Sequence, residues 1–239
     1  MGISIGIVGI GGIFLIPILT AAGVGLEDAI GASLVAFTVT GLVATAIYGR
    51  RRAIDWRSTG LTSLGSVVGG PLGAKLSVWL PEIVVSVCFA AFLLMTGVTA
   101  LARRGSADVG GSAPAIGWPV LAVCGLVVGV GSGLTGVGGP AILVPLLLLL
   151  RFPSSAAIAI SQPNAIAASA SGAFGHLAFG RIDFLLAAGL SLVAGTGVAL
   201  GAAIHQRIAA GTLRKVVAAA CIGLGLWLSG KLLQRLPGH

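Results

Sequence analysis

The chain has 239 residues, of which 56% are hydrophobic and 8% are charged, and its net charge is +8. A soluble domain carries about 25% charged residues, so this chain has too little polar surface to cover itself in water. Its basic residues lie between apolar stretches and form no long run interleaved with aromatic residues. That pattern argues against a nucleic-acid partner and is typical of the loops of membrane proteins.

Eight apolar segments can be drawn along the chain, several of them as long as the roughly 20 residues that a helix needs to cross a bilayer. Their limits are 2–22, 28–49, 58–80, 83–102, 118–150, 155–178, 184–206 and 213–234. A polar, glycine- and serine-rich stretch separates the first four from the last four. We therefore predict an all-α polytopic membrane protein with an N-terminal repeat at 1–104, a linker at 105–117 and a C-terminal repeat at 118–239.

The two halves match each other at a constant offset of 128 residues over their second and third segments. The matched pairs are Ser33 and Ser161, Tyr48 and His176, Asp55 and Asp183, Gly69 and Gly197, and Gly73 and Gly201. A constant offset through several landmarks indicates duplication, and in duplicated transporters the binding site lies at the interface of the repeats. Because fewer residues precede the first glycine motif than the second, we expect that a stretch is missing before Met1.

Two topologies are compatible with a duplicated chain. If every segment crosses the membrane once, the repeats are parallel and the basic residues divide 9 against 5 between the two sides. If the first segment of each half is a re-entrant hairpin, the repeats are inverted and the division becomes 10 against 4. The positive-inside rule favours the more uneven division, so inverted repeats with broken or re-entrant first segments are the favoured topology.

Glycine and proline cluster at matching places in the first segment of each half. The clusters are Gly9, Gly11 and Gly12 before Pro17, and Gly136, Gly138 and Gly139 before Pro145. Both residue types disfavour the interior of a helix, and irregular backbone at membrane depth occurs only where it is buried in protein or lines a wet cavity. A half-helix that begins there offers free N–H groups and a positive dipole end to an anion. The alternative is close helix packing through small residues.

Polar side chains mark the second segment of each half. The candidate binding residues there are Ser33, Thr38, Ser161, Gln162, Asn164 and His176. Two amides flank Pro163, which lacks a backbone donor, and amides can hydrogen-bond an oxyanion without burying a full charge. Hydrogen bonding between helices is the alternative role. His176 could bind substrate, relay protons or lie at the membrane interface, and the sequence leaves these open.

Other polar and small residues fit structural roles. Asp55 and Asp183 each stand where the next segment begins, and aspartate is a good N-cap. Glycines at four-residue spacing in the third and seventh segments predict a helix-packing face; they are Gly65, Gly69, Gly73, Gly197 and Gly201. The three cysteines stand singly, without metal-ligand spacing or a disulfide framework. We expect neither a cofactor nor a metal.

The repeated Gly-x-Gly-Gly…Pro motif, the Ile-Asp-aromatic motif after each second segment and the Gly-x-x-x-Gly of the third segment resemble the TauE/SafE sulfite exporter family. The resemblance runs from Gly2 to Gln234. It implies a secondary transporter, not an enzyme, for sulfite or small organosulfur anions such as sulfonates, in the inner membrane of a bacterium. It also implies that both glycine motifs line the transport path.

The leading hypothesis is therefore alternating access, with a small anion held between the halves by half-helix N-termini and by Ser33, Ser161, Gln162 and Asn164. Proton or sodium coupling and a homodimer are left open. One alternative is an anion channel or a subunit of a membrane complex. A second is an intramembrane serine hydrolase, in which Ser132 would act with a histidine.

Overall fold

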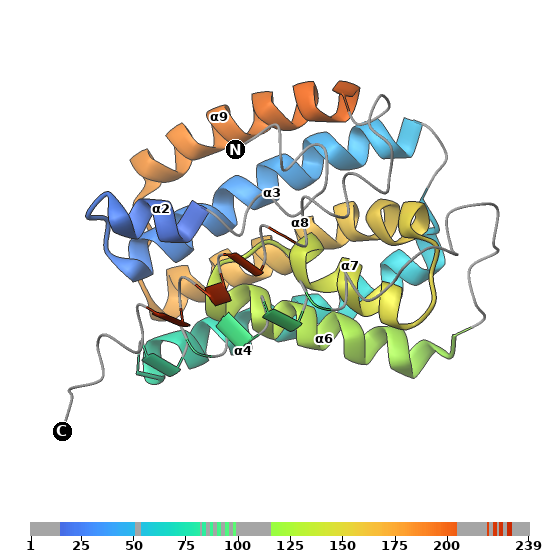
Figure 1. Cartoon of the computed structure of the whole chain (residues 1–239), viewed down its shortest axis with the longest axis horizontal. Coiled ribbons are helices and arrows are strands. Elements are labelled where there is room, and N and C mark those ends of the chain that lie inside the picture. The colour runs from blue at the N-terminus through green and yellow to red at the C-terminus, as the bar shows by residue number, and fades with distance from the viewer. Residues whose placement is uncertain are drawn as a thin grey trace.

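The computed structural model describes residues 15–50, 54–81 and 116–204, with single positions between 83 and 98 and between 219 and 230. The regular elements of these residues are all helices, which confirms the predicted all-α fold (Figure 1). The helices are α2 (Leu15–Ala21), α3 (Leu26–Arg50), α4 (Trp56–Trp79), α6 (Trp118–Thr135), α7 (Gly139–Leu149), α8 (Ser154–Phe179) and α9 (Phe184–Ile204).

The predicted segments reappear as helices with small shifts at their ends. Those at 28–49, 58–80, 155–178 and 184–206 correspond to α3, α4, α8 and α9. The long segment at 118–150 is divided, as expected, into α6 and α7 by the non-helical residues 136–138. Most of the segments predicted at 83–102 and 213–234, nearly all of the 105–117 linker, and Gly9, Gly11 and Gly12 lie outside the described residues.

Aspartate begins the third helix of each half, as the sequence predicted. The carboxylate of Asp55 accepts from the backbone N–H of Arg57 at 3.1 Å and from the Ser58 hydroxyl at 2.6 Å. The carboxylate of Asp183 accepts from the N–H of Leu186 at 3.0 Å. The bonds from the Arg57 and Leu186 N–H groups each satisfy a helix-start donor that the helix itself leaves free.

Helices α3 and α8, which occupy equivalent places in the two halves, run in opposite directions (Figure 1). Gly31, near the start of α3, lies against Arg181 just beyond the end of α8. Gly41, farther along α3, lies against Ala165 and Ile166 in the middle of α8. Opposed equivalent helices are the arrangement of inverted repeats, the topology that the distribution of basic residues favoured.

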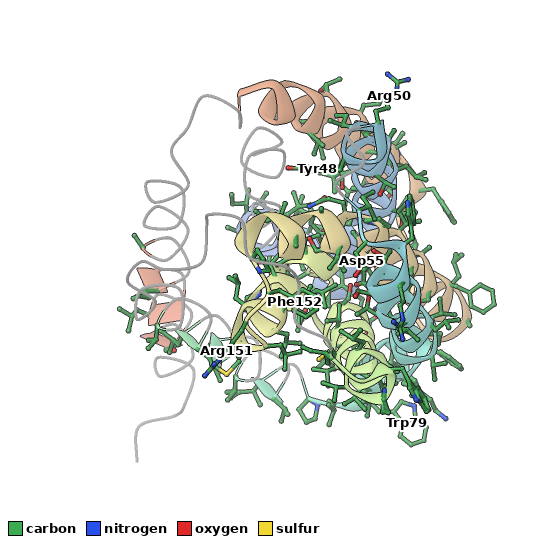
Figure 2. The ribbon with its side chains drawn as sticks, turned by 90° about the vertical axis from the view of Figure 1, so that its right-hand side faces the viewer. Tyr48, Arg50, Asp55, Trp79, Arg151 and Phe152 are labelled. Atoms are coloured by element: carbon green, nitrogen blue, oxygen red, sulfur yellow. The ribbon has the colours of Figure 1, made fainter. Side chains whose placement is uncertain are left out.

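The inversion brings the basic loops of the two halves to one end of the molecule. Because α3 finishes where α8 starts, the end of the molecule that faces the viewer in Figure 2 includes Arg50, the last residue of α3, and the loop residues Asp55 and Arg151. Lys75 and Arg181 belong to the opposite end, near the finish of α4 and α8. This division agrees with the positive-inside prediction for inverted repeats.

The halves are interlocked because each third helix packs against the opposite half. Helix α4 packs mainly on α6 and α8, and α9 packs on α3. Helices α4 and α6 run parallel, and a Cβ on Gly65, Gly69 or Gly73 would collide with the α6 backbone. The predicted packing role of this glycine face is thus confirmed, because only residues without a side chain allow so close an approach.

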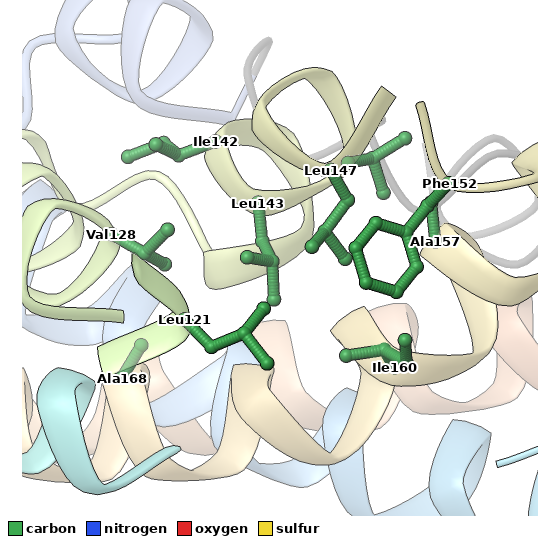
Figure 3. Packing of buried hydrophobic residues seen from close by; sticks show 10 residues of the cluster. Leu121, Val128, Ile142, Leu143, Leu147, Phe152, Ala157, Ile160 and Ala168 are labelled. Atoms are coloured by element: carbon green, nitrogen blue, oxygen red, sulfur yellow. The ribbon is translucent and has the colours of Figure 1, made fainter. Parts of the chain in front are cut away.

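An apolar cluster fixes α6, α7 and α8 to one another (Figure 3). Leu121 and Val128 of α6 meet Leu143 and Leu147 of α7 within it, and Phe152 closes it beside the start of α8. By length and composition, α3 and α6 could each cross a membrane. The outer face of α9 is strongly apolar, with Leu185 86% exposed, which suits contact with lipid tails.

Candidate functional site

Gly136 ends α6 in a conformation that other residues rarely adopt. Its φ is 66° and its N–H donates to the carbonyl of Ser132 at 2.8 Å. A Cβ there would also lie 2.9 Å from the side chains of Ile16 and Ile30. A left-handed backbone and a close approach of α2 and α3 therefore both require glycine at this position.

Helix α7 begins three residues later, at Gly139, and presents its N-terminus to the interior. A Cβ on Gly138, its N-cap, would meet the Phe37 ring of α3 at 2.9 Å. The first bond of α7 runs from the Ala141 N–H to the Gly138 carbonyl at 3.1 Å. Among the hydrogen bonds of the described residues, none comes from the N–H of Gly138 or Gly139. The start of α7 therefore carries free donors and the positive end of the helix dipole.

Asn164 of α8 faces this N-terminus from the other side. Its side chain is fully buried, and its Nδ2 donates to the Ser66 hydroxyl of α4 at 2.9 Å. Its Oδ1 has no partner. A Cβ built on Gly139 would lie 3.1 Å from that oxygen, so the amide oxygen of Asn164 is directed at the first residue of α7.

Ser33 of α3 completes the surroundings of the break. It is fully buried and its hydroxyl has no partner. Ser33 is three residues after Ile30 and four before Phe37, which contact Gly136 and Gly138 respectively. Residues three and four apart share one face of a helix, so Ser33 faces the break.

Three of the predicted residues use their side chains within their own helices. Thr38 donates to the Leu34 carbonyl at 2.9 Å and Ser161 donates to the Ile158 carbonyl at 2.7 Å. The Gln162 amide lies 3.4 Å from that same Ile158 carbonyl. Their roles in binding stay predictions, whereas Ser33, Asn164 and the second glycine motif are brought together at the break.

His176 is buried in a separate polar cluster. It follows Asn164 by twelve residues, which is about 18 Å along a helix. Its Nε2 lies 2.9 Å from the carbonyl of Gly133, which can only accept, so Nε2 carries a proton. Ser77 of α4 lies 3.5 Å away. His176 therefore lies in the protein interior, between α4, α6 and α8.

Ser66 is the functional candidate that the sequence did not reveal. Its hydroxyl donates to the Gly125 carbonyl of α6 at 2.8 Å and holds the Asn164 amide. Its own carbonyl accepts from the Ser171 hydroxyl at 3.1 Å. The sequence offered one signal for its role: Ser66 directly follows Gly65, the first glycine of the packing face of α4.

Comparison with known proteins matches the chain to one family model and to relatives that are named as membrane transporters. A family model described as "Sulfite exporter TauE/SafE" matches residues 1–228. Probable membrane transporter protein YunE of Bacillus subtilis is 28% identical over 219 residues, which cover 84% of this chain and 80% of the relative. Probable membrane transporter protein YjnA, also of Bacillus subtilis, is 23% identical, with 95% of each chain covered. A probable membrane transporter protein of Methanocaldococcus jannaschii is 27% identical over 169 residues, covering 67% of this chain and 62% of the relative. No solved structure matches the chain.

Proposed function

The chain belongs to the sulfite exporter TauE/SafE family and is a membrane transporter, and from this premise we propose that it carries a small sulfur-containing anion by alternating access. The substrate is sulfite, a sulfonate or a related organic anion. The membrane is the inner membrane of a bacterium, which the chain crosses several times. The two repeats are those at 1–104 and 118–239, joined by the 105–117 linker.

The observation that carries this proposal is the set of unsatisfied polar groups around the break between α6 and α7. Free N–H groups and a helix N-terminus attract an anion. The buried hydroxyl of Ser33 has a donor to spare, and Asn164 Oδ1 is a buried acceptor without a partner, whereas buried polar groups ordinarily have partners. The described charged residues lie at or near helix ends, for example Glu27, Arg57, Arg151 and Asp183, so neutral dipoles would hold the anion.

The place of this site supports alternating access. It is enclosed by α3 of the first half and by α6, α7 and α8 of the second. A substrate would reach it when the start of α7 separates from Asn164 or from Phe37, once toward each side of the membrane. By the internal symmetry, Gly9, Gly11 and Gly12 would form the corresponding part of the path in the first half.

Flux measurements in proteoliposomes test the proposal. We expect saturable movement of labelled sulfite, thiosulfate or methanesulfonate, and a roughly tenfold or larger loss of transport efficiency in Ser33→Ala and Asn164→Ala. Ser191→Ala is the matched control, because that hydroxyl donates to its own helix at the Ala187 carbonyl, away from the break. Flux that never saturates would indicate a channel, and no flux of any of these anions would contradict the proposal.

The geometry gives no support to a serine hydrolase. Ser132 is fully buried and its hydroxyl has no partner. The ring of His176 donates to the Gly133 carbonyl and does not reach the Ser132 hydroxyl. A nucleophilic serine needs an adjacent base, and the described part of the chain does not supply that pair.

A further inference from the structure

The hydrogen bonds behind Asn164 have a fixed direction. The Gly125 carbonyl can only accept, so the Ser66 hydroxyl uses its one proton in the bond to that carbonyl. The Ser66 oxygen must then accept from Asn164, and only the NH2 end of the amide can donate. The amide oxygen of Asn164 is thereby directed at Gly139, and it cannot exchange places with the nitrogen without breaking the bond to Ser66.

The site consequently presents two opposite requirements within a few ångströms. The N–H groups at the start of α7 need an acceptor, and the buried Asn164 Oδ1 needs a donor. An anion that offers only lone pairs would satisfy the first and leave the amide oxygen facing a negatively charged oxygen. An anion with an O–H group beside a charged oxygen on the same central atom would satisfy both.

We propose that the hydrogen-bonded series Gly125–Ser66–Asn164 makes this transporter select singly protonated oxyanions. Among small sulfur-containing anions, hydrogensulfite is an example of this class. The proposal rests on the transport function proposed above and specifies the protonation state of its substrate. Ser66 acts as a positioning residue, because it fixes the orientation of the amide that meets the substrate. Methanesulfonate has the same charge and a similar size but no O–H, so it is the discriminating competitor.

Binding to the purified full-length protein tests the selection. At mildly acidic pH, where sulfite is mostly singly protonated, we expect hydrogensulfite to bind roughly tenfold or more tightly than methanesulfonate, because the latter leaves a buried acceptor unpaired. As the pH rises, affinity for total sulfite should fall with the singly protonated fraction, while affinity for methanesulfonate should stay constant. This comparison needs no substitution and so does not depend on the folding of a variant.

The substitution Ser66→Ala tests the role of the hydrogen bonds that link Gly125, Ser66 and Asn164. Without the serine, the Asn164 amide can turn its NH2 toward α7, so the preference for hydrogensulfite should fall by roughly tenfold as methanesulfonate gains affinity. Ser171→Ala is the matched control, because its hydroxyl bonds the Ser66 carbonyl and not the amide, and it should keep the wild-type preference. Thermal melting of both variants checks that each is folded.

The outcomes separate the two proposals. Equal affinity for both anions, or a preference that Ser66→Ala leaves unchanged, overturns the selection by protonation state while leaving an anion transporter. If the preference for hydrogensulfite also disappears in Ser171→Ala, the specific role of the Ser66 hydroxyl is overturned. Failure to bind or move either anion overturns the proposed transport of small sulfur-containing anions.

Discussion

Gly139 shows how a single residue can control the candidate site. It is the first residue of α7, and its missing side chain lets Asn164 Oδ1 and the backbone of Ala165 come close. Its N–H is also one of the free donors at that helix start. Small size and an unpaired donor are thus combined at the position nearest to the fixed amide oxygen.

We expect Gly139→Ala to impair transport. The added methyl group would lie 3.1 Å from Asn164 Oδ1 and 3.2 Å from Ala165 Cα, a contact that costs about 1–3 kcal/mol where neighbours cannot move. Flux should fall roughly tenfold or more, which corresponds to about 1.4 kcal/mol. Gly189→Ala in α9 is the control, since no atom lies within 4 Å of its Cβ. Wild-type flux in Gly139→Ala would exclude a role for this contact in transport.

At the scale of elements, the contact between α4 and α6 determines where Ser66 lies. Gly69 and Gly129 let the two backbones approach closely, and Ser66, at the same level, reaches the Gly125 carbonyl. Substituting either glycine would push α4 away from α6, and Ser66 would move away from the candidate site with it.

Gly69→Ala should therefore destabilise the protein. Its Cβ would collide with the Leu126 carbonyl, and the α6 backbone can relieve that clash only by moving. We expect a loss of about 1–3 kcal/mol, seen as a lower melting temperature in detergent. Gly60→Ala lies in the same helix with no atom within 4 Å and should be neutral or slightly stabilising, because alanine favours helix. Equal melting temperatures for the two variants would count against a tight contact.

The sequence predicted the elements better than their contacts. Apolar length identified α3, α4, α8 and α9, and matched glycines identified the break between α6 and α7, because both signals are local. The pairing of Ser66 with Asn164 was not predictable, since it depends on how α4 crosses α8. His176 lies about 18 Å along α8 from Asn164, so its role in binding stays a prediction.

At the scale of the whole molecule, the inversion of the repeats has a direct experimental signature. Asp55 and Asp183 are equivalent in sequence, yet they belong to opposite ends of the bundle because α3 and α8 are antiparallel. The end that includes Arg50, Arg57 and Arg151 is the more basic among the described residues, so we assign it to the cytoplasmic side.

Cysteine labelling checks this assignment. In a background without the native cysteines, Arg57→Cys should react with an impermeant maleimide only from the cytoplasmic side, and Arg181→Cys only from the outside. Both positions are exposed, and each lies two residues from one of the equivalent aspartates. Labelling of the unsubstituted cysteine-free protein gives the background. Reaction of both positions from one side would mean parallel repeats and contradict the structure.

The interlocking of the halves also bears on how the protein is made. Helix α4 leaves the ribosome before its partners α6 and α8 exist, although it carries buried polar side chains on its inner face, namely Ser58, Thr59, Thr62 and Ser66. Insertion of α4 and its final pairing are therefore separate events in time, as they are for many membrane helices. In the interval, the Ser66 hydroxyl lacks its later partner, the Gly125 carbonyl of α6. Assembly of the candidate site is consequently a late event, completed only when α8 has entered the bilayer.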